Sequence, residues 1–263
     1  MRQKERQRPI LFSVAVFLCF GSTLFSQASN PGKSATARLV IIPFVGCKSD
    51  GQVGPLDAPT GHAPAMKIPS DLAQRLAYYK AEDGVGVLAP RGWYCFSTYG
   101  SNGSNLFVSP VALDAKTLFS TSWKGFTGSA IQISVAGGGT SGRFQVAKMI
   151  ARVFPDHRQF VRDVIAEGIV PASSFPAGPY PQDKLTYRSK NVVEFETPAN
   201  TEGLGTASRL QADSKPIRGV AILLSDDDTS LVQLSARLPA QDRDLIAVII
   251  QQVEREASAA TDR

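Results

Sequence analysis

The chain has 263 residues, of which 43% are hydrophobic and 19% charged, and its formal net charge is +5. This composition supports a buried core and excludes a wholly disordered or fibrous protein. Residues 1–28 hold four basic side chains and one acidic one, so the net charge of the remaining residues falls from +5 to +2. A balance so close to neutral carries no electrostatic signature of nucleic-acid binding.

The N-terminus has the pattern of a secretory signal peptide. Its basic residues precede an apolar run over residues 10–25, which ends in Ser26, Gln27 and Ala28. Small residues occupy the two positions that a signal peptidase reads, and the apolar run is short for a hydrocarbon core of ~30 Å. We therefore expect cleavage after Ala28 and a periplasmic or secreted protein without a membrane span. The alternative is that the segment is retained as an anchor.

Two cysteines, Cys47 and Cys95, lie outside this leader, 48 positions apart. In an exported chain such a pair is most simply a disulfide, and closing a loop of this length stabilises the fold by about 4 kcal/mol. The chain has no Cys-x-x-Cys pair and no regularly spaced further ligands, so a redox or metal role is disfavoured. We expect no cofactor and no metal site.

Beyond the leader, we expect residues 29–38 to form a disordered linker and residues 39–263 to form a single domain. Apolar periodicity separates strands from helices within it. The expected strands are residues 39–45, 85–87, 93–99, 106–108, 130–135, 193–196, 220–224 and 232–238. The expected helices are one that begins at Ser70 and buries Leu72, Leu76 and Tyr79, one over residues 144–154, one capped by Asp156 and ending at Gly168, and one over residues 242–256.

Two of these strands alternate apolar with polar residues. Gln132 and Ser134 alternate with isoleucines in the first, and Gln233, Ser235 and Arg237 alternate with Val232, Leu234 and Ala236 in the second. Such alternation is typical of antiparallel strands with one face in water. We therefore expect these polar side chains to be solvated.

Hairpin signals connect several of the strands. An Asn102-Gly103 pair lies between two apolar runs, and both residues tolerate the backbone of a tight turn. Strands joined by hairpins, with helices inserted as a block and at the end, predict an α+β fold with a mostly antiparallel sheet packed by helices.

Two segments carry a resemblance to a known fold. The Gly86-Val-Leu-Ala-Pro-Arg-Gly-Trp93 segment, and the hairpin that ends in Arg237-Leu238-Pro239 before an amphipathic helix, resemble the opening and the closing helix of PsbP-type folds. That resemblance implies an αβα sandwich, and members of the group mostly act as accessory or binding proteins. The insert over residues 112–167 departs from the pattern. The chain is also similar to exported bacterial proteins of uncharacterised role.

Residues 91–105 are rich in aromatic side chains, glycine and asparagine. We take Arg91, Trp93, Tyr99, Asn102 and Asn105 as the candidate ligand-binding residues, because aromatic faces and amides can stack on and hydrogen-bond to a sugar ring or a peptide. The structural alternative is that the aromatic residues belong to the core. We expect a non-catalytic binding or accessory protein whose partner is an envelope protein, a glycan or a small ligand.

Three further patterns leave alternatives open. A hydrolase could combine Ser101 or Ser141 with His157 and Asp156, although no G-x-S-x-G elbow is present. Residues 137–142 match G-x-G-x-x-G between a strand and a helix, so Gly137 to Gly142 could bind an anion or a nucleotide or could be a plain connection. The Asp226, Asp227, Asp228 run favours a hairpin turn over a calcium site.

Overall fold

An eight-stranded sheet forms the centre of the fold. The computed structural model describes residues 38–225 and 228–261, and every structural statement below concerns these residues. The strand order is β10 (Lys184–Ser189), β11 (Val192–Thr197), β12 (Ile217–Ser225), β13 (Thr229–Arg237), β9 (Ala130–Gly137), β8 (Gly103–Ser109), β7 (Tyr94–Gly100) and β3 (Ser49–Gly51). All neighbouring strands are antiparallel except β3 and β7.

Two smaller sheets and the helices complete the fold. One sheet contains β2 (Phe44–Gly46), β5 (Leu76–Lys80) and β6 (Val87–Pro90), and the other pairs β1 (Arg38–Val40) with β4 (Met66–Ile68). The helices are α1 (Ser70–Arg75), α2 (Ala115–Leu118), α3 (Arg143–Val153), α4 (Arg158–Ala166) and α5 (Ile246–Thr261), with 3-10 turns η1 (Pro155–His157), η2 (Ala172–Ser174) and η3 (Ala240–Leu245). The expected α+β class with a mostly antiparallel sheet is confirmed.

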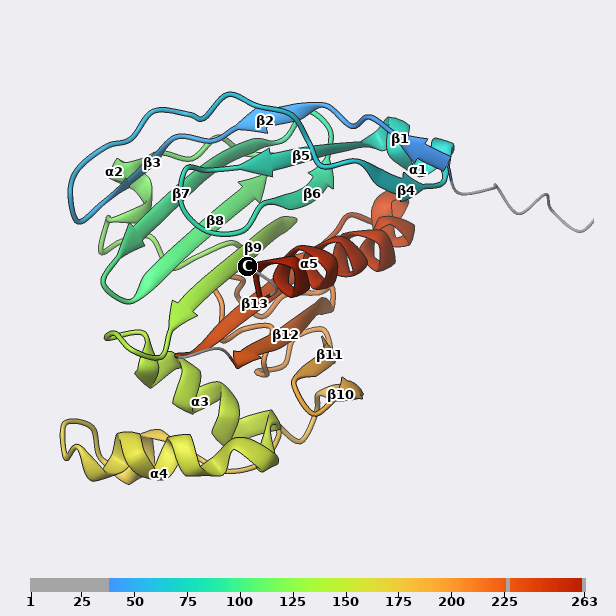
Figure 1. Cartoon of the computed structure of the whole chain (residues 1–263). Coiled ribbons are helices and arrows are strands. Elements are labelled where there is room, and N and C mark those ends of the chain that lie inside the picture. Colours follow the sequence, from blue (N-terminus) through green and yellow to red (C-terminus); the bar gives the residue numbers. More distant parts are fainter. Residues whose placement is uncertain (1–37, 226–227, 262–263) are drawn as a thin grey trace, which may run out of the picture. The chain divides into compact units, whose positions relative to one another are not determined.

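The main core lies between one face of the large sheet and α5. Ile131 and Ile133 of β9 and Val232 and Leu234 of β13 point to this side and are buried. Figure 1 shows α5 lying along β12 and β13, which it contacts, and α5 also contacts β6. Because alternate residues of a strand face opposite sides, these four apolar residues form a continuous surface for the apolar stripe of α5.

Polar side chains of α5 also cover the edge of β6. The Gln252 amide accepts a hydrogen bond from Leu88 N (2.9 Å) and donates one to Gly86 O (3.0 Å), as a neighbouring strand would. Glu256 accepts hydrogen bonds from the Tyr78 hydroxyl (2.7 Å) and from Gly86 N (3.1 Å). Burial and the adjacent Glu256 charge raise the pKa of Tyr78. Helix α5 thus satisfies backbone groups that an open strand edge would leave unpaired.

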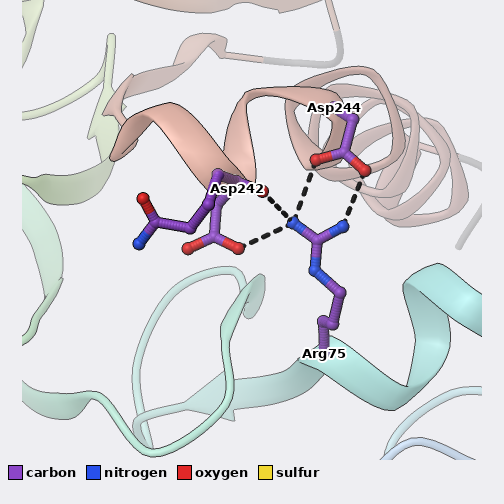
Figure 2. A network of polar contacts seen from close by, with 4 residues as sticks. Arg75, Asp242 and Asp244 are labelled. Carbon is purple, nitrogen blue, oxygen red and sulfur yellow. Dashed lines mark hydrogen bonds and ion pairs between the residues drawn. The ribbon is translucent and has the colours of Figure 1, made fainter.

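A surface ion-pair network joins α1 to η3. Arg75, the last residue of α1, donates hydrogen bonds to Asp242 (2.7 Å), to Asp244 (2.7 Å) and to the Gln241 carbonyl (Figure 2). Hydrogen bonds to Asp244 and Asp242 raise the pKa of Arg75, and the same contact lowers the pKa of Asp244. The network links the end of α1, which leads into β5 of the three-stranded sheet, to the 3-10 turn that precedes α5.

The opposite face of the large sheet is covered by α3, which packs with α4 (Figure 1). Buried residues of α3 such as Val146 and Ile150 meet Ala136 of β9 and Leu231 of β13 in a second core. A third apolar cluster lies further along the same face, around Phe107 of β8. The α3 side of the sheet therefore has two separate apolar patches.

Most sequence-predicted elements are present, with several differences. The helix expected from Ser70 ends at Arg75, and the chain continues as β5, because pairing with β6 outweighs the helical spacing of Leu76 and Tyr79. The single strand expected over residues 39–45 is split around Pro43, which cannot donate to a ladder. Strands β3, β4 and β10 and helix α2 were not predicted, and Asp156 lies within η1 and does not cap α4.

The expected disulfide between Cys47 and Cys95 is present, with an Sγ–Sγ distance of 2.01 Å. It connects the residue after β2 to β7 and so links the three-stranded sheet to the large one. Residues 1–37, which contain the expected leader and most of the expected linker, lie outside the described residues, and Arg38 already belongs to β1. In the part of the chain described, no helix combines the length and apolarity that a membrane span requires.

Candidate functional site

The polar faces of β9 and β13 are buried, so the expectation that water covers them is wrong. Gln132, Ser134, Gln233 and Ser235 have exposed fractions of 5%, 4%, 4% and 0%. The two strands pair antiparallel, with Gln132 opposite Ser235 and Ser134 opposite Gln233. Together with Asn105 of β8, which is opposite Ser134, these residues form what we call the polar stripe. It runs between the two apolar patches on the α3 side of the sheet.

A crossing segment, residues 203–211, pairs with one end of the stripe, and we call it the strap. Arg209 N donates to Gln132 Oε1 at 2.6 Å. Gln132 Nε2 in turn donates to Asn105 Oδ1 (3.0 Å) and to Ser134 Oγ (2.8 Å), and Ser134 Oγ donates to Asn105 Oδ1 (2.8 Å). The backbone amide of the strap therefore sets the direction of every hydrogen bond in this group.

The other end of the strap is held by Gln233 and Asp183. Gln233 Nε2 donates to Leu204 O at 3.1 Å, and Leu204 N donates to Asp183 Oδ2 at 2.8 Å. The buried Thr197 hydroxyl donates to Asp183 Oδ1 (2.6 Å) and accepts from Gly205 N (2.9 Å). Both ends of the strap are thus bonded to groups that the sheet or its flanking loop presents.

Arg237 is a structural residue on the same face. Its side chain is fully buried, and the guanidinium donates to the carbonyl oxygens of Gly128 (2.7 Å), Gln211 (2.5 Å) and Phe126 (2.7 Å). Burial lowers the pKa of Arg237, and the Asp213 carboxylate, 3.9 Å away, acts in the opposite direction. Arg237 thus ties the end of the strap to the loop before β9.

A cleft of about 290 Å³ lies between α3, the loop after η2 and the strap, and we call it the α3 cleft. Two cationic side chains line it, and none of its lining residues is Asp, Glu, His or Cys. The lining residues are Gln145, Lys148, Met149, Arg152, Ser174, Pro176, Tyr180, Leu204, Ala207 and Gln233. Its volume is close to the lower end of the range of ~300–1,000 Å³ found for small-molecule sites.

The cationic groups of the α3 cleft are held in place by neighbours. The Arg152 guanidinium carbon lies 4.1 Å from the centroid of the Tyr180 ring, and Nη1 donates to Gly178 O at 3.2 Å. Lys148 is exposed one turn earlier on α3, and residues four apart on a helix lie on one side. The remaining guanidinium N–H groups and the Lys148 ammonium are therefore available to an anion.

The floor of the α3 cleft supplies an acceptor. Gln233 uses its Nε2 amine for Leu204 O and, at 3.5 Å, for Ser235 Oγ. Its Oε1 atom has no donor among the described residues, although the side chain is almost fully buried and lines the cleft. Because the side chain lines the cleft, this carbonyl oxygen can accept a hydrogen bond from a ligand hydroxyl or amine, or from water.

The five residues selected from the sequence do not converge on one pocket. Arg91 and Trp93 precede β7, whereas Asn102 lies in the turn at the other end of the β7–β8 hairpin, roughly 20 Å away at the usual rise per strand residue. Trp93 packs against the main core, and the Tyr99 hydroxyl donates to Gly54 O at 2.6 Å. Only Asn105 belongs to the polar stripe. A binding role for the other four stays a prediction.

The catalytic alternative finds no assembled group. His157 Nε2 lies 2.8 Å from Asn191 Oδ1, at the β10–β11 turn. Ser101 and Ser141 contact each other at 3.1 Å, and no described hydrogen bond joins either hydroxyl to His157. Within the described ranges, no three His, Cys, Asp or Glu side chains lie close enough to hold a metal ion.

The glycine-rich turn is explained by close packing. A side chain at Gly142 would place a Cβ 2.5 Å from Asn102 O, and one at Gly138 would come within 2.0 Å of Thr229 O. The Thr140 hydroxyl accepts from Gly142 N, and the Asp228 carboxylate lies beside Gly139. An acidic neighbour disfavours a phosphate there. Asp226 and Asp227 lie outside the described residues, between β12 and β13.

Searches of protein-family models, curated proteins and solved structures find no match to this chain. The resemblance to PsbP-type folds stays a prediction. Sequence reasoning missed Lys148, Arg152 and Gln233. The available signal for Lys148 and Arg152 was a pair of basic residues four positions apart on one predicted helix. The other side of that helix buries Val146, Ala147 and Ile150.

Proposed function

We propose that this protein is a non-catalytic binding protein, acting in the periplasm or outside the cell, that holds a small organic anion in the α3 cleft. The observation that carries the proposal is the lining of the cleft: Lys148 and Arg152 without a carboxylate, above the unpaired Oε1 atom of Gln233. The ligand carries a carboxylate or phosphate for the two cations and a hydroxyl or amine for Gln233.

Electrostatics favours an anion in this position. A guanidinium with free N–H groups binds carboxylate and phosphate in a bidentate manner, and the Tyr180 ring and Gly178 carbonyl hold Arg152 in one orientation before a ligand arrives. Preorganisation of this kind reduces the entropy lost on binding. Met149, Leu204 and Pro176 supply apolar contact for the carbon skeleton.

The lining supports binding over catalysis. General acid–base catalysis uses His most often, and Glu, Asp, Lys, Tyr or Cys as well. Of these residue types, the lining of the α3 cleft holds Lys148 and Tyr180 and no His, Glu, Asp or Cys. The compartment is supported by the leader pattern over residues 1–28 and by the Cys47–Cys95 disulfide, because disulfides persist in oxidising compartments.

Isothermal titration calorimetry of the purified protein tests the proposal. The probes are acetate, pyruvate, succinate, citrate and inorganic phosphate, at constant ionic strength. We expect at least one to bind, and Arg152→Gln to weaken it by about tenfold or more, because a hydrogen bond to a charged group is lost. Lys148→Gln weakens binding less, because the ammonium is exposed.

Arg158→Gln is the matched control, since Arg158 is an exposed arginine at the start of α4 and does not line the cleft. It removes the same charge from the same side of the sheet. Equal affinities for Arg152→Gln and Arg158→Gln would contradict the site. Failure of every probe to bind the unmodified protein would contradict the function.

A further inference from the structure

A second recess, of about 100 Å³, lies on the same side of the sheet around Asn105 and Arg209. Its aromatic walls are Phe107, Phe119 and Trp123, and its polar groups belong to Thr98, Asn105 and Arg209. We call it the aromatic recess. It shares no lining residue with the α3 cleft, and the strap supplies residues to both.

The aromatic walls are arranged to accept a flat group. The Phe107 and Trp123 rings meet at 83° with centroids 6.4 Å apart, and the Arg209 guanidinium carbon lies 5.8 Å from the Trp123 centroid. Phe119 is 58% exposed although it is large and apolar. An exposed phenyl group at the rim of a recess is available to cover an aromatic ligand. Aromatic rings prefer to meet edge to face or in an offset stack.

The polar stripe fixes what the floor of the recess offers. Asn105 Oδ1 accepts from both Gln132 and Ser134, and the orientation of Gln132 is set by Arg209 N. Because an asparagine amide has one oxygen and one amine, Asn105 must present its Nδ2 amine to the recess. No described residue accepts a hydrogen bond from it. The recess thus offers amide donors beside an exposed guanidinium, and no carboxylate lines it.

We propose that the aromatic recess binds a small planar carboxylate of the aromatic-acid class, with the ring against Trp123 and Phe119 and the carboxylate on Asn105 Nδ2 and Arg209. The inference is independent of the function proposed for the α3 cleft. A closed cavity of ~150 Å³ admits benzene. The recess is smaller but open to solvent beside Phe119 and Arg209, so a single ring bound there would keep one edge exposed.

The experiment is a titration of the whole protein with 4-fluorobenzoate, followed by ¹⁹F NMR line broadening and by tryptophan fluorescence. Benzyl alcohol, which keeps the ring and lacks the charge, and acetate, which keeps the charge and lacks the ring, are the comparison probes. We expect 4-fluorobenzoate to bind and each comparison probe to bind about tenfold more weakly or worse, because each loses one of the two contacts.

Asn105→Asp is the decisive variant. Its Oδ1 still accepts from Gln132 and Ser134, so the stripe keeps its internal bonds, while an anionic oxygen replaces the outward amine. We expect binding of 4-fluorobenzoate to be lost. Asn200→Asp is the matched control, because it makes the same change at an exposed turn that lines neither recess and should leave binding unchanged. Arg209→Gln, at an exposed side chain, provides a second variant that keeps the strap amide.

The outcomes separate this recess from the α3 cleft. Loss of binding in Asn105→Asp and Arg209→Gln, with binding retained in Arg152→Gln, supports the proposal. Binding that is lost in Arg152→Gln and retained in Asn105→Asp and Arg209→Gln overturns it and places the acid in the α3 cleft. Absence of binding to the unmodified protein also overturns it and leaves the α3 cleft untouched.

Discussion

The two faces of the large sheet are built on different principles. Toward α5, residues such as Ile133, Val232 and Leu234 form a continuous apolar surface. Toward α3, the polar stripe divides the apolar surface into two patches, and the strap covers the stripe. The first face packs through one continuous apolar surface, and the second combines two apolar clusters with a group of hydrogen bonds between them. Both candidate recesses lie on the second face.

The largest expected effect concerns Arg237 on the α3 face. Arg237→Met keeps the bulk of the side chain and removes three donors, so the carbonyls of Gly128 and Gln211 lose the guanidinium and Phe126 O keeps only its hydrogen bond from Gln211 N. We expect the free energy of unfolding to fall by about 3–5 kcal/mol, measured by urea denaturation. Arg218→Met, at a 52% exposed side chain paired with Glu196, should cost less than about 1 kcal/mol. Comparable losses would show that Arg237 does not hold the strap.

Leu234→Ala examines the α5 face. Leu234 is fully buried, and truncation leaves a cavity, so we expect a loss of about 2–5 kcal/mol in unfolding free energy. The loss should appear as global destabilisation, with no change in ligand binding at either recess. If binding at the α3 cleft changed while stability did not, the separation between the two faces would be wrong.

Gln132→Leu examines the polar stripe directly. The change preserves approximate volume and leaves Arg209 N without an acceptor, at an expected cost of about 1–3 kcal/mol. Hydrogen exchange should show faster exchange at the Arg209 amide than at amides of α5. Unchanged protection at Arg209 would mean that the strap does not depend on the stripe.

The smallest expected effect is a pH dependence on the α5 face. Burial, together with the nearby Glu194 charge, raises the pKa of Glu254, and its Oε1 atom is buried without a partner. A carboxyl whose pKa is higher in the folded state binds more protons there, so stability falls as pH rises through the unfolded pKa toward the folded one.

Glu254→Gln should therefore raise the melting temperature at neutral pH and have no effect below the pKa of the unfolded glutamate, about 4.3. Because the Glu254 side chain is only partly buried and solvent screens its charge, we expect the gain to stay below about 1 kcal/mol. Thermal unfolding at several pH values measures it. A gain that grew toward acid pH would reverse the sign and contradict the argument.

The sequence predicted the elements whose local pattern matches their final state. Asn102 and Gly103 mark the β7–β8 turn because their backbone preferences hold in any context. The buried residues of α3 recur at the helical period. Prediction failed at residues 76–80, where helical spacing of Leu76 and Tyr79 competed with pairing to β6. Of the candidate site residues, Asn105 belongs to the polar stripe, and the α3 cleft was not foreseen.

Local chemistry by itself determined that β9 and β13 have one apolar and one polar face, and that Cys47 and Cys95 could pair. Only the tertiary structure decided that the polar face is covered, because Gln132 and Arg209 are 77 positions apart. Alternation of residue types specifies which side chains share a face. Whether a face meets water or another segment depends on chain folding over such distances, and in this protein that covering creates both recesses.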